Sequence, residues 1–126
     1  MLDVKQKVYS SVMDANLPLE DSPVMNRKTY PYGLVRTVSV VRSRYKNYYK
    51  ANWLLKIDLF SSYAGEKECL DWFDTLEQKV FKDLMDNDQV TYVQLSHDIL
   101  DDKEQGPVTK HGIITIVVDT MEVPQA

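Results

Sequence analysis

The sequence is poor in the residues that reactive or cross-linked sites need. Its 126 residues include one cysteine, Cys69, and two histidines, His97 and His111. A single cysteine excludes a disulfide within the chain and a zinc site built from several cysteines. None of these three residues lies in a catalytic or metal-binding motif. We therefore expect no enzyme, no metal and no cofactor, with Cys69 a small buried apolar side chain and both histidines partly exposed.

Glycine and long apolar runs are also scarce. The four glycines are isolated, so the chain has no glycine-rich loop to hold phosphate groups. No window approaches the roughly 20 apolar residues that cross a bilayer, and residues 1–7 lack the apolar core of a secretory signal. With 44% hydrophobic and 27% charged residues, the composition is that of an ordinary globular chain. We expect one domain over residues 1–126, with no membrane span.

Charge is modest in sum but uneven along the chain. The formal net charge of −4 argues against broad DNA binding, which depends on neutralising phosphates with lysine and arginine. Residues 42–52 contain four basic residues and no acid, whereas residues 66–88 contain eight acids and three lysines. Two such patches either orient a partner or a second copy, or are solvated surfaces without a further role.

Hydrophobic periodicity predicts two helices and four strands. Apolar residues at every third or fourth position indicate helices, and period-two alternation with β-branched residues indicates strands. The predicted helices cover residues 2–15 and 65–85, and the predicted strands cover residues 34–42, 53–60, 89–96 and 108–119. We predict an α+β fold: a four-stranded, mainly antiparallel sheet on which the N-terminal helix and the long central helix pack, in the order α-β-β-α-β-β.

The remaining segments are predicted from their apolar pattern and their turn residues. Three prolines make residues 16–33 a loop, and the acidic stretch 98–104 begins a turn. Residues 108–119 are apolar on both faces, which predicts a central, covered strand. The central helix carries a broad apolar stripe, which is expected to pack on the sheet. Its predicted members are Cys69, Leu70, Trp72, Phe73, Leu76, Val80, Phe81, Leu84 and Met85.

The segment between the first two strands, residues 42–52, is the one that suggests a partner. Arginine and tyrosine anchor protein interfaces because they combine large contact area with directed hydrogen bonds. The same residue types also stack on single-stranded bases while neutralising phosphates. The acidic total favours a protein interface formed by a hairpin arm; a small nucleic-acid-binding module and a plain solvated hairpin are the alternatives. The candidate interface residues are Arg42, Arg44, Tyr45, Lys46, Tyr48, Tyr49 and Lys50.

A strand that runs through a polar turn into the central helix carries a family resemblance. Residues 55–66 read LKIDLFSSYAGE and lead into Leu70, Trp72, Phe73 and Leu76. This stretch, together with the order of the predicted elements, resembles the tail terminator or tail-completion (head-tail joining) proteins of long-tailed bacteriophages. The resemblance extends over most of the chain as an order of elements rather than as a strict motif.

The resemblance implies a structural role in a virion, at the tail and neck, after assembly in the host cytoplasm. Proteins of this family form a ring, commonly a hexamer, that caps the last ring of tail-tube subunits and joins the tail to the neck. The implied partners are further copies of the chain, the tail-tube protein and neck or connector proteins, while DNA passes through the lumen without specific binding. The family uses no cofactor and has no catalytic residues to transfer, so only the arm at 42–52 is carried over.

Overall fold

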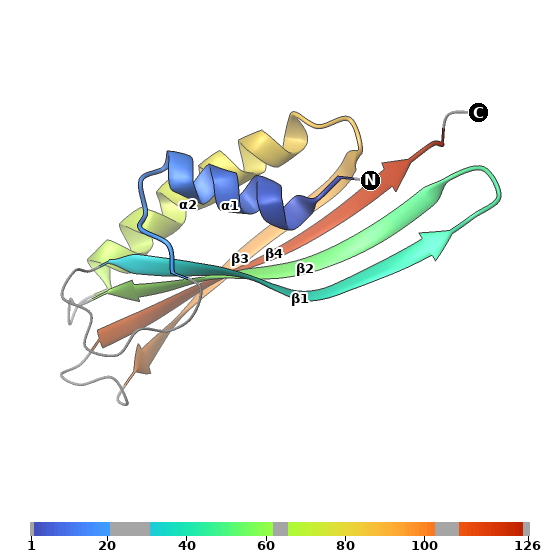
Figure 1. Cartoon of the computed structure of the whole chain (residues 1–126). Coiled ribbons are helices and arrows are strands. Elements are labelled where there is room, and N and C mark those ends of the chain that lie inside the picture. The colour runs from blue at the N-terminus through green and yellow to red at the C-terminus, as the bar shows by residue number, and fades with distance from the viewer. Residues whose placement is uncertain (1, 21–30, 62–65, 103–108, 125–126) are drawn as a thin grey trace.

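The computed structural model describes residues 2–20, 31–61, 66–102 and 109–124. Two helices and four strands follow one another in the predicted α-β-β-α-β-β order (Figure 1). The elements are α1 (Val4–Asp14), β1 (Tyr32–Arg44), β2 (Tyr49–Ser61), α2 (Lys67–Met85), β3 (Val90–Asp102) and β4 (Thr109–Glu122). The α+β fold class is therefore confirmed.

One antiparallel sheet contains all four strands, in the order β1-β2-β4-β3. Both helices lie on the same face of this sheet (Figure 1). The central position predicted for the last strand is confirmed, but its predicted cover on both faces is wrong. Ile114, Ile116 and Val118 are buried under the helices, whereas Ile113 and Val117, on the helix-free face, are only half-buried.

The core forms where three apolar patterns meet. On α1, Val4, Val8 and Val12 recur every four residues and are fully buried. Asp3 caps this helix by accepting a hydrogen bond from the backbone amide of Gln6 (3.1 Å). On β2 and β4, alternate side chains point toward the helices, as the period of a strand requires. The buried apolar side chains that these two strands contribute to the core under the helices are Ala51, Trp53, Leu55, Ile57, Leu59, Ile114, Ile116 and Val118.

The apolar stripe of α2 is narrower than its sequence predicts. The buried residues are Cys69, Phe73, Leu76, Val80 and Leu84, while Trp72 is half-buried. Leu70, Phe81 and Met85 are instead 46%, 47% and 47% exposed, which corrects their assignment to the core. A helix on a sheet buries only the arc that faces the sheet and its neighbouring helix, so the residues beside that arc stay in solvent.

Helix α2 lies between α1 on one side and β3 on the other. Toward α1, the Ser11 hydroxyl donates a hydrogen bond to Asp83 Oδ2 (2.6 Å). Toward β3, Glu77 Oε1 lies 2.7 Å from His97 Nδ1. These two contacts show which sides of α2 face the neighbouring elements.

The strands extend beyond their predicted ends. The first begins at Tyr32, inside the predicted loop 16–33, and the isolated bridge Leu19–Gly33 pairs another part of that loop with it. Residues 21–30 of the predicted loop lie outside the described residues. The predicted turn region, which extends from 98 to 107, is wrong for 98–102, which pair with β4 as far as Asp102–Thr109. Its residues from 103 onward lie outside the described part of the chain. The long β4 offers a hydrogen-bonding partner over this whole length, which outweighs the local turn preference of the acids.

Neither helix is long and apolar enough to span a membrane, judged over the residues that the structure describes.

Candidate protein interface

The 42–52 segment, called the arm from here on, is an ordered hairpin. Strands β1 and β2 continue past the ends of both helices and are joined at the far end of the sheet (Figure 1). Arg44 is paired with Tyr49, and the Tyr45 amide donates a hydrogen bond to the Tyr48 carbonyl (2.8 Å), which closes the turn. Strand β4 pairs with the second strand of the arm over its whole length, from Asn52 (with Asp119) to Tyr49 (with Glu122). Only residues 45–48 therefore extend beyond the sheet.

Aromatic and basic side chains are packed together at the tip of the arm. The rings of Tyr45 and Tyr48 stack with centroids 4.6 Å apart. Lys50 Nζ lies 5.7 Å from the Tyr48 ring and 6.0 Å from the Tyr45 ring, which are cation–π distances. Arg44 Nη2 donates a hydrogen bond to the Tyr49 hydroxyl (2.8 Å), and its guanidinium carbon lies 4.9 Å from that ring. These contacts link the aromatic and basic side chains of the tip to one another.

The structure places the seven predicted interface residues at different points along the arm. Those in the contacts at the tip are Arg44, Tyr45, Tyr48, Tyr49 and Lys50. Lys46 lies in the turn itself, and Arg42 is paired with Ala51 further down the arm. Tyr48 and Tyr49 are half-buried against their neighbours, and the other five are exposed. The tip is therefore a pre-ordered, positively charged aromatic surface.

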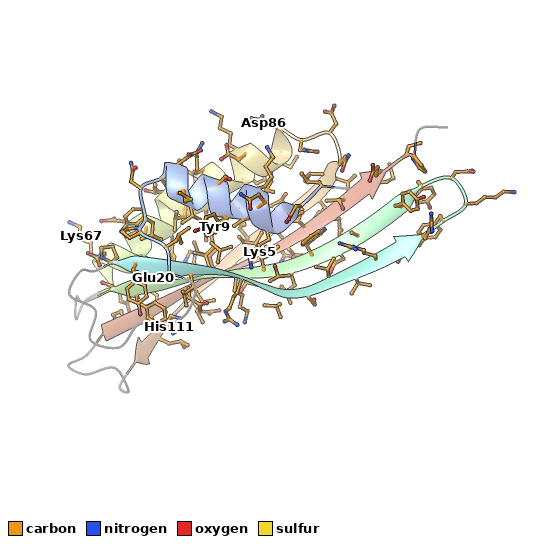
Figure 2. The ribbon with its side chains drawn as sticks, in the orientation of Figure 1. Lys5, Tyr9, Glu20, Lys67, Asp86 and His111 are labelled. Atoms are coloured by element: carbon orange, nitrogen blue, oxygen red, sulfur yellow. The ribbon has the colours of Figure 1, made fainter. Side chains whose placement is uncertain are left out.

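A polar cluster that the sequence did not indicate lies on the helix-free face of the sheet. Asp58 is 3% exposed, and its Oδ2 accepts a hydrogen bond from Arg36 Nε (2.6 Å). His111 Nε2 lies 2.9 Å from Asp58 Oδ1, and Figure 2 shows His111 on the side of the sheet away from the helices. The His111 ring also stacks on Phe60, which stacks on Tyr32. The only sequence signal was an acid in the middle of an apolar strand.

The pKa of Asp58 lies below its ordinary value of 3.8. Burial alone would raise this pKa, but the hydrogen bonds from His111 and Arg36, together with their positive charge, outweigh it. The carboxylate is thus ionised and partnered at neutral pH. Arg36 comes from β1 and His111 comes from β4, so the cluster links β2 to both of its neighbouring strands.

We predict that Asp58→Asn lowers the free energy of unfolding by about 1 to 3 kcal/mol at pH 7, because the hydrogen bonds to a buried carboxylate are lost or weakened. Since the folded-state pKa is lowered, this contribution is present above the unfolded pKa near 3.8 and fades as pH falls through and below it. Urea denaturation from pH 7 to pH 2.5 measures the effect.

The difference between the wild-type protein and the variant is the quantity to follow in that titration. The pKa of Asp83 is lowered as well, since hydrogen bonds from Ser11 and Lys79 outweigh its burial, but Asp83 titrates equally in both proteins. The two stability curves should converge at acid pH. A constant gap down to pH 2.5 would show that the Asp58 charge does not stabilise the fold.

The residues with reactive groups occupy structural positions. Cys69 is fully buried, as predicted, and burial, helped by the nearby Glu68, raises the pKa of its thiol to about 11. A thiol with this pKa is protonated at neutral pH and is a poor nucleophile. His97 stacks on Phe73 and contacts Glu77. Over the described residues, no group of three or more histidine, cysteine, aspartate or glutamate side chains is placed to hold a metal ion.

The fold and the arm together define an α+β domain with two helices on one face of an antiparallel sheet and an ordered basic hairpin beyond them. The same fold occurs in a solved structure of the virion of a native gene transfer agent (GTA) particle. The match has a TM-score of 0.66 and covers 94% of this chain and 94% of the matched chain, at 10% sequence identity. No protein-family model matches this sequence, and no curated protein matches it significantly by sequence.

Proposed function

We propose that this chain is a structural protein of a phage-like virion. It forms a ring, with six copies as the expected number, at the head-proximal end of a tail, where it ends growth of the tail tube and joins the tail to the neck. The observation that carries the proposal is the fold match to a chain of a GTA virion, which spans 94% of both chains.

The arm supports an assembly role for a physical reason. It extends past both helices, so its tip adds nothing to the core of its own chain (Figure 1). Tyr45 is 48% exposed, and Lys46 and Lys50 are exposed beside it. Tyrosine, together with basic side chains held in fixed positions, loses little conformational entropy on binding, which suits a contact surface. We propose further copies, the tail-tube protein and neck proteins as the partners, with DNA passing through the lumen.

We also propose that the chain is not an enzyme. Its only thiol is buried and has a raised pKa, and His111 is engaged with Asp58. Such groups stabilise a fold, whereas a nucleophile needs a lowered pKa or an adjacent base.

Two measurements on the purified protein test the ring. Light scattering should give the mass of a closed oligomer, and negative-stain images of isolated tail tubes mixed with the protein should show one tube end capped. Some rings assemble only on their tube. If light scattering finds only monomer, the negative-stain images therefore decide the test. A monomer that also leaves both tube ends bare would contradict the proposal.

The exposed basic and tyrosine side chains of the arm also favour a second candidate, a small nucleic-acid-binding module. Binding of this kind releases counterions, so its affinity falls steeply with salt. Titration of labelled single-stranded DNA at 50 mM and 200 mM salt distinguishes the two. The ring proposal expects no salt-sensitive binding, and tight binding that salt weakens would favour the module.

A further inference from the structure

A second surface, which the rest of the described residues leave uncovered, runs along α2. Three large apolar side chains, Leu70, Phe81 and Met85, are each nearly half exposed there. Asp74 and Gln78 stand between them at three- and four-residue steps, so the five residues form one line along the helix. Gln78 Nε2 donates a hydrogen bond to Asp74 Oδ1 (3.0 Å). This line is called the α2 ridge from here on.

The α2 ridge lies on the side of the helix that faces β3. Glu77 touches His97 of β3, and Phe81 lies one turn after Glu77 on the same side of α2. Asp83, which contacts Ser11 of α1, lies on the opposite side. The ridge therefore overhangs one edge strand of the sheet, whereas the arm is formed by β1, the other edge strand, and its neighbour β2.

The two surfaces are opposite in charge and alike in having exposed apolar area. Residues 42–52 carry four basic side chains and no acid, and the five residues of the ridge include one acid, Asp74, and no base. Asp74 is exposed on the ridge, and Asp71 is exposed beside it. A basic tip with stacked tyrosines complements a ridge that carries an acid, a phenylalanine and a methionine, because opposite charges set the orientation and the apolar groups exclude water.

We propose that the arm of one copy docks on the α2 ridge of the next copy. The stacked Tyr45 and Tyr48 cover Phe81 and Met85, and the basic side chains of the arm face Asp71 and Asp74. This inference rests on the proposed ring and names the surfaces that build it. Because the arm and the ridge lie at opposite edges of one sheet, each copy uses one surface on each side, which is the head-to-tail contact that closes rings.

The occupant is a second copy rather than the arm of the same chain. In each copy the arm points away from both helices, at the far end of the sheet (Figure 1). The described residues of each copy provide one arm and one ridge, so every copy in a ring can contact a neighbour through each of the two surfaces. An unrelated partner for either surface would leave the other one exposed.

Disulfide trapping tests the docking directly. One batch carries Asn47→Cys, a change at an exposed turn position that keeps both stacked tyrosines, and a second batch carries Gln78→Cys. Both changes are made in the full chain, and the two batches are mixed and oxidised. Native Cys69 is buried and stays unreactive. We expect a disulfide-linked heterodimer on a non-reducing gel. Ser10→Cys, an exposed site on α1, is the matched control and should give no such product. A Gln78 product no stronger than the Ser10 product would overturn the docking.

A charge exchange provides the second readout. Arg44→Glu with Lys46→Glu should abolish association of the copies, and Asp71→Lys with Asp74→Lys should do the same. The chain with all four changes should associate again, since each charged pair is restored in reverse. Failure of the combined variant to associate, with circular dichroism showing it folded, would overturn the docking.

These outcomes separate the docking from the proposed function. Capped tube ends without the Asn47–Gln78 product would support the ring and overturn the docking. The disulfide product without capped tubes would keep the contact between copies and remove the role in a tail.

Discussion

Phe73→Ala is expected to lower the free energy of unfolding by about 3 to 5 kcal/mol, the range for truncating a buried phenylalanine. Phe73 is 1% exposed and stacks on His97 with ring centroids 4.5 Å apart. Its ring also lies against Gly112 of β4, where an added Cβ would come within 2.7 Å of the Phe73 Cζ atom. The ring thus fills a space that the absence of a side chain at 112 leaves open, and truncation leaves a cavity between α2 and the sheet.

Urea denaturation at pH 7 measures this effect, and two further variants on the same helix serve as comparisons. Trp72→Ala should cost less than Phe73→Ala because Trp72 is only half-buried. Phe81→Ala removes an equally large ring from a 47% exposed position and should stay within about 0.5 kcal/mol. A Phe81 variant as unstable as the Phe73 variant would mean that the two rings have been assigned to the wrong sides of α2.

The second large effect is expected from Tyr48→Ala combined with Tyr49→Ala. The tip of the arm lies outside the core, so the fold should lose about 1.5 kcal/mol or less, the contribution of a stacked aromatic pair. Assembly should suffer far more: loss of an interface hot spot worth about 2 kcal/mol or more weakens association at least about 30-fold. Sedimentation velocity over a concentration series gives the association constant, and negative-stain images give the fraction of capped tubes.

A matched control separates loss of the arm from loss of any exposed tyrosine. Tyr92 is 49% exposed on β3, away from the arm, and Tyr92→Ala should leave both stability and assembly unchanged. If the tyrosine pair instead collapses the melting curve, these rings belong to the core. Normal assembly by a folded variant with Tyr48→Ala and Tyr49→Ala would show that the arm is not part of the interface.

Local repetition in the sequence was enough to predict the helices. Val4, Val8 and Val12 recur at the spacing of a helix, and this alone places α1 within two residues of its observed start. The order of all six elements and the central place of β4 followed in the same way, from periods of two and of about 3.6 residues. The arm is evident in the sequence as a stretch of one charge with three tyrosines.

The ends of the strands needed the tertiary structure. Residues 98–102 look like a turn because acids favour turns, yet they form part of β3 because β4 runs alongside them. The same holds at Tyr32, where β1 pairs with Phe60 of β2 inside what the sequence presents as a loop. A hydrogen-bonding partner from elsewhere in the chain outweighs the local preference of a few residues.

The arm and the α2 ridge differ in how far the sequence alone predicts them. Composition by itself determined that residues 42–52 are basic and aromatic, because charge and residue type are properties of each position. Only the folded chain decided that Phe81 and Met85 are exposed while Phe73 and Leu84 are buried. Only the fold brought His111 to Asp58, 53 positions away, and Arg36 to the same carboxylate. Periodicity describes neighbours along the chain, whereas burial and pairing depend on which distant segments pack against them.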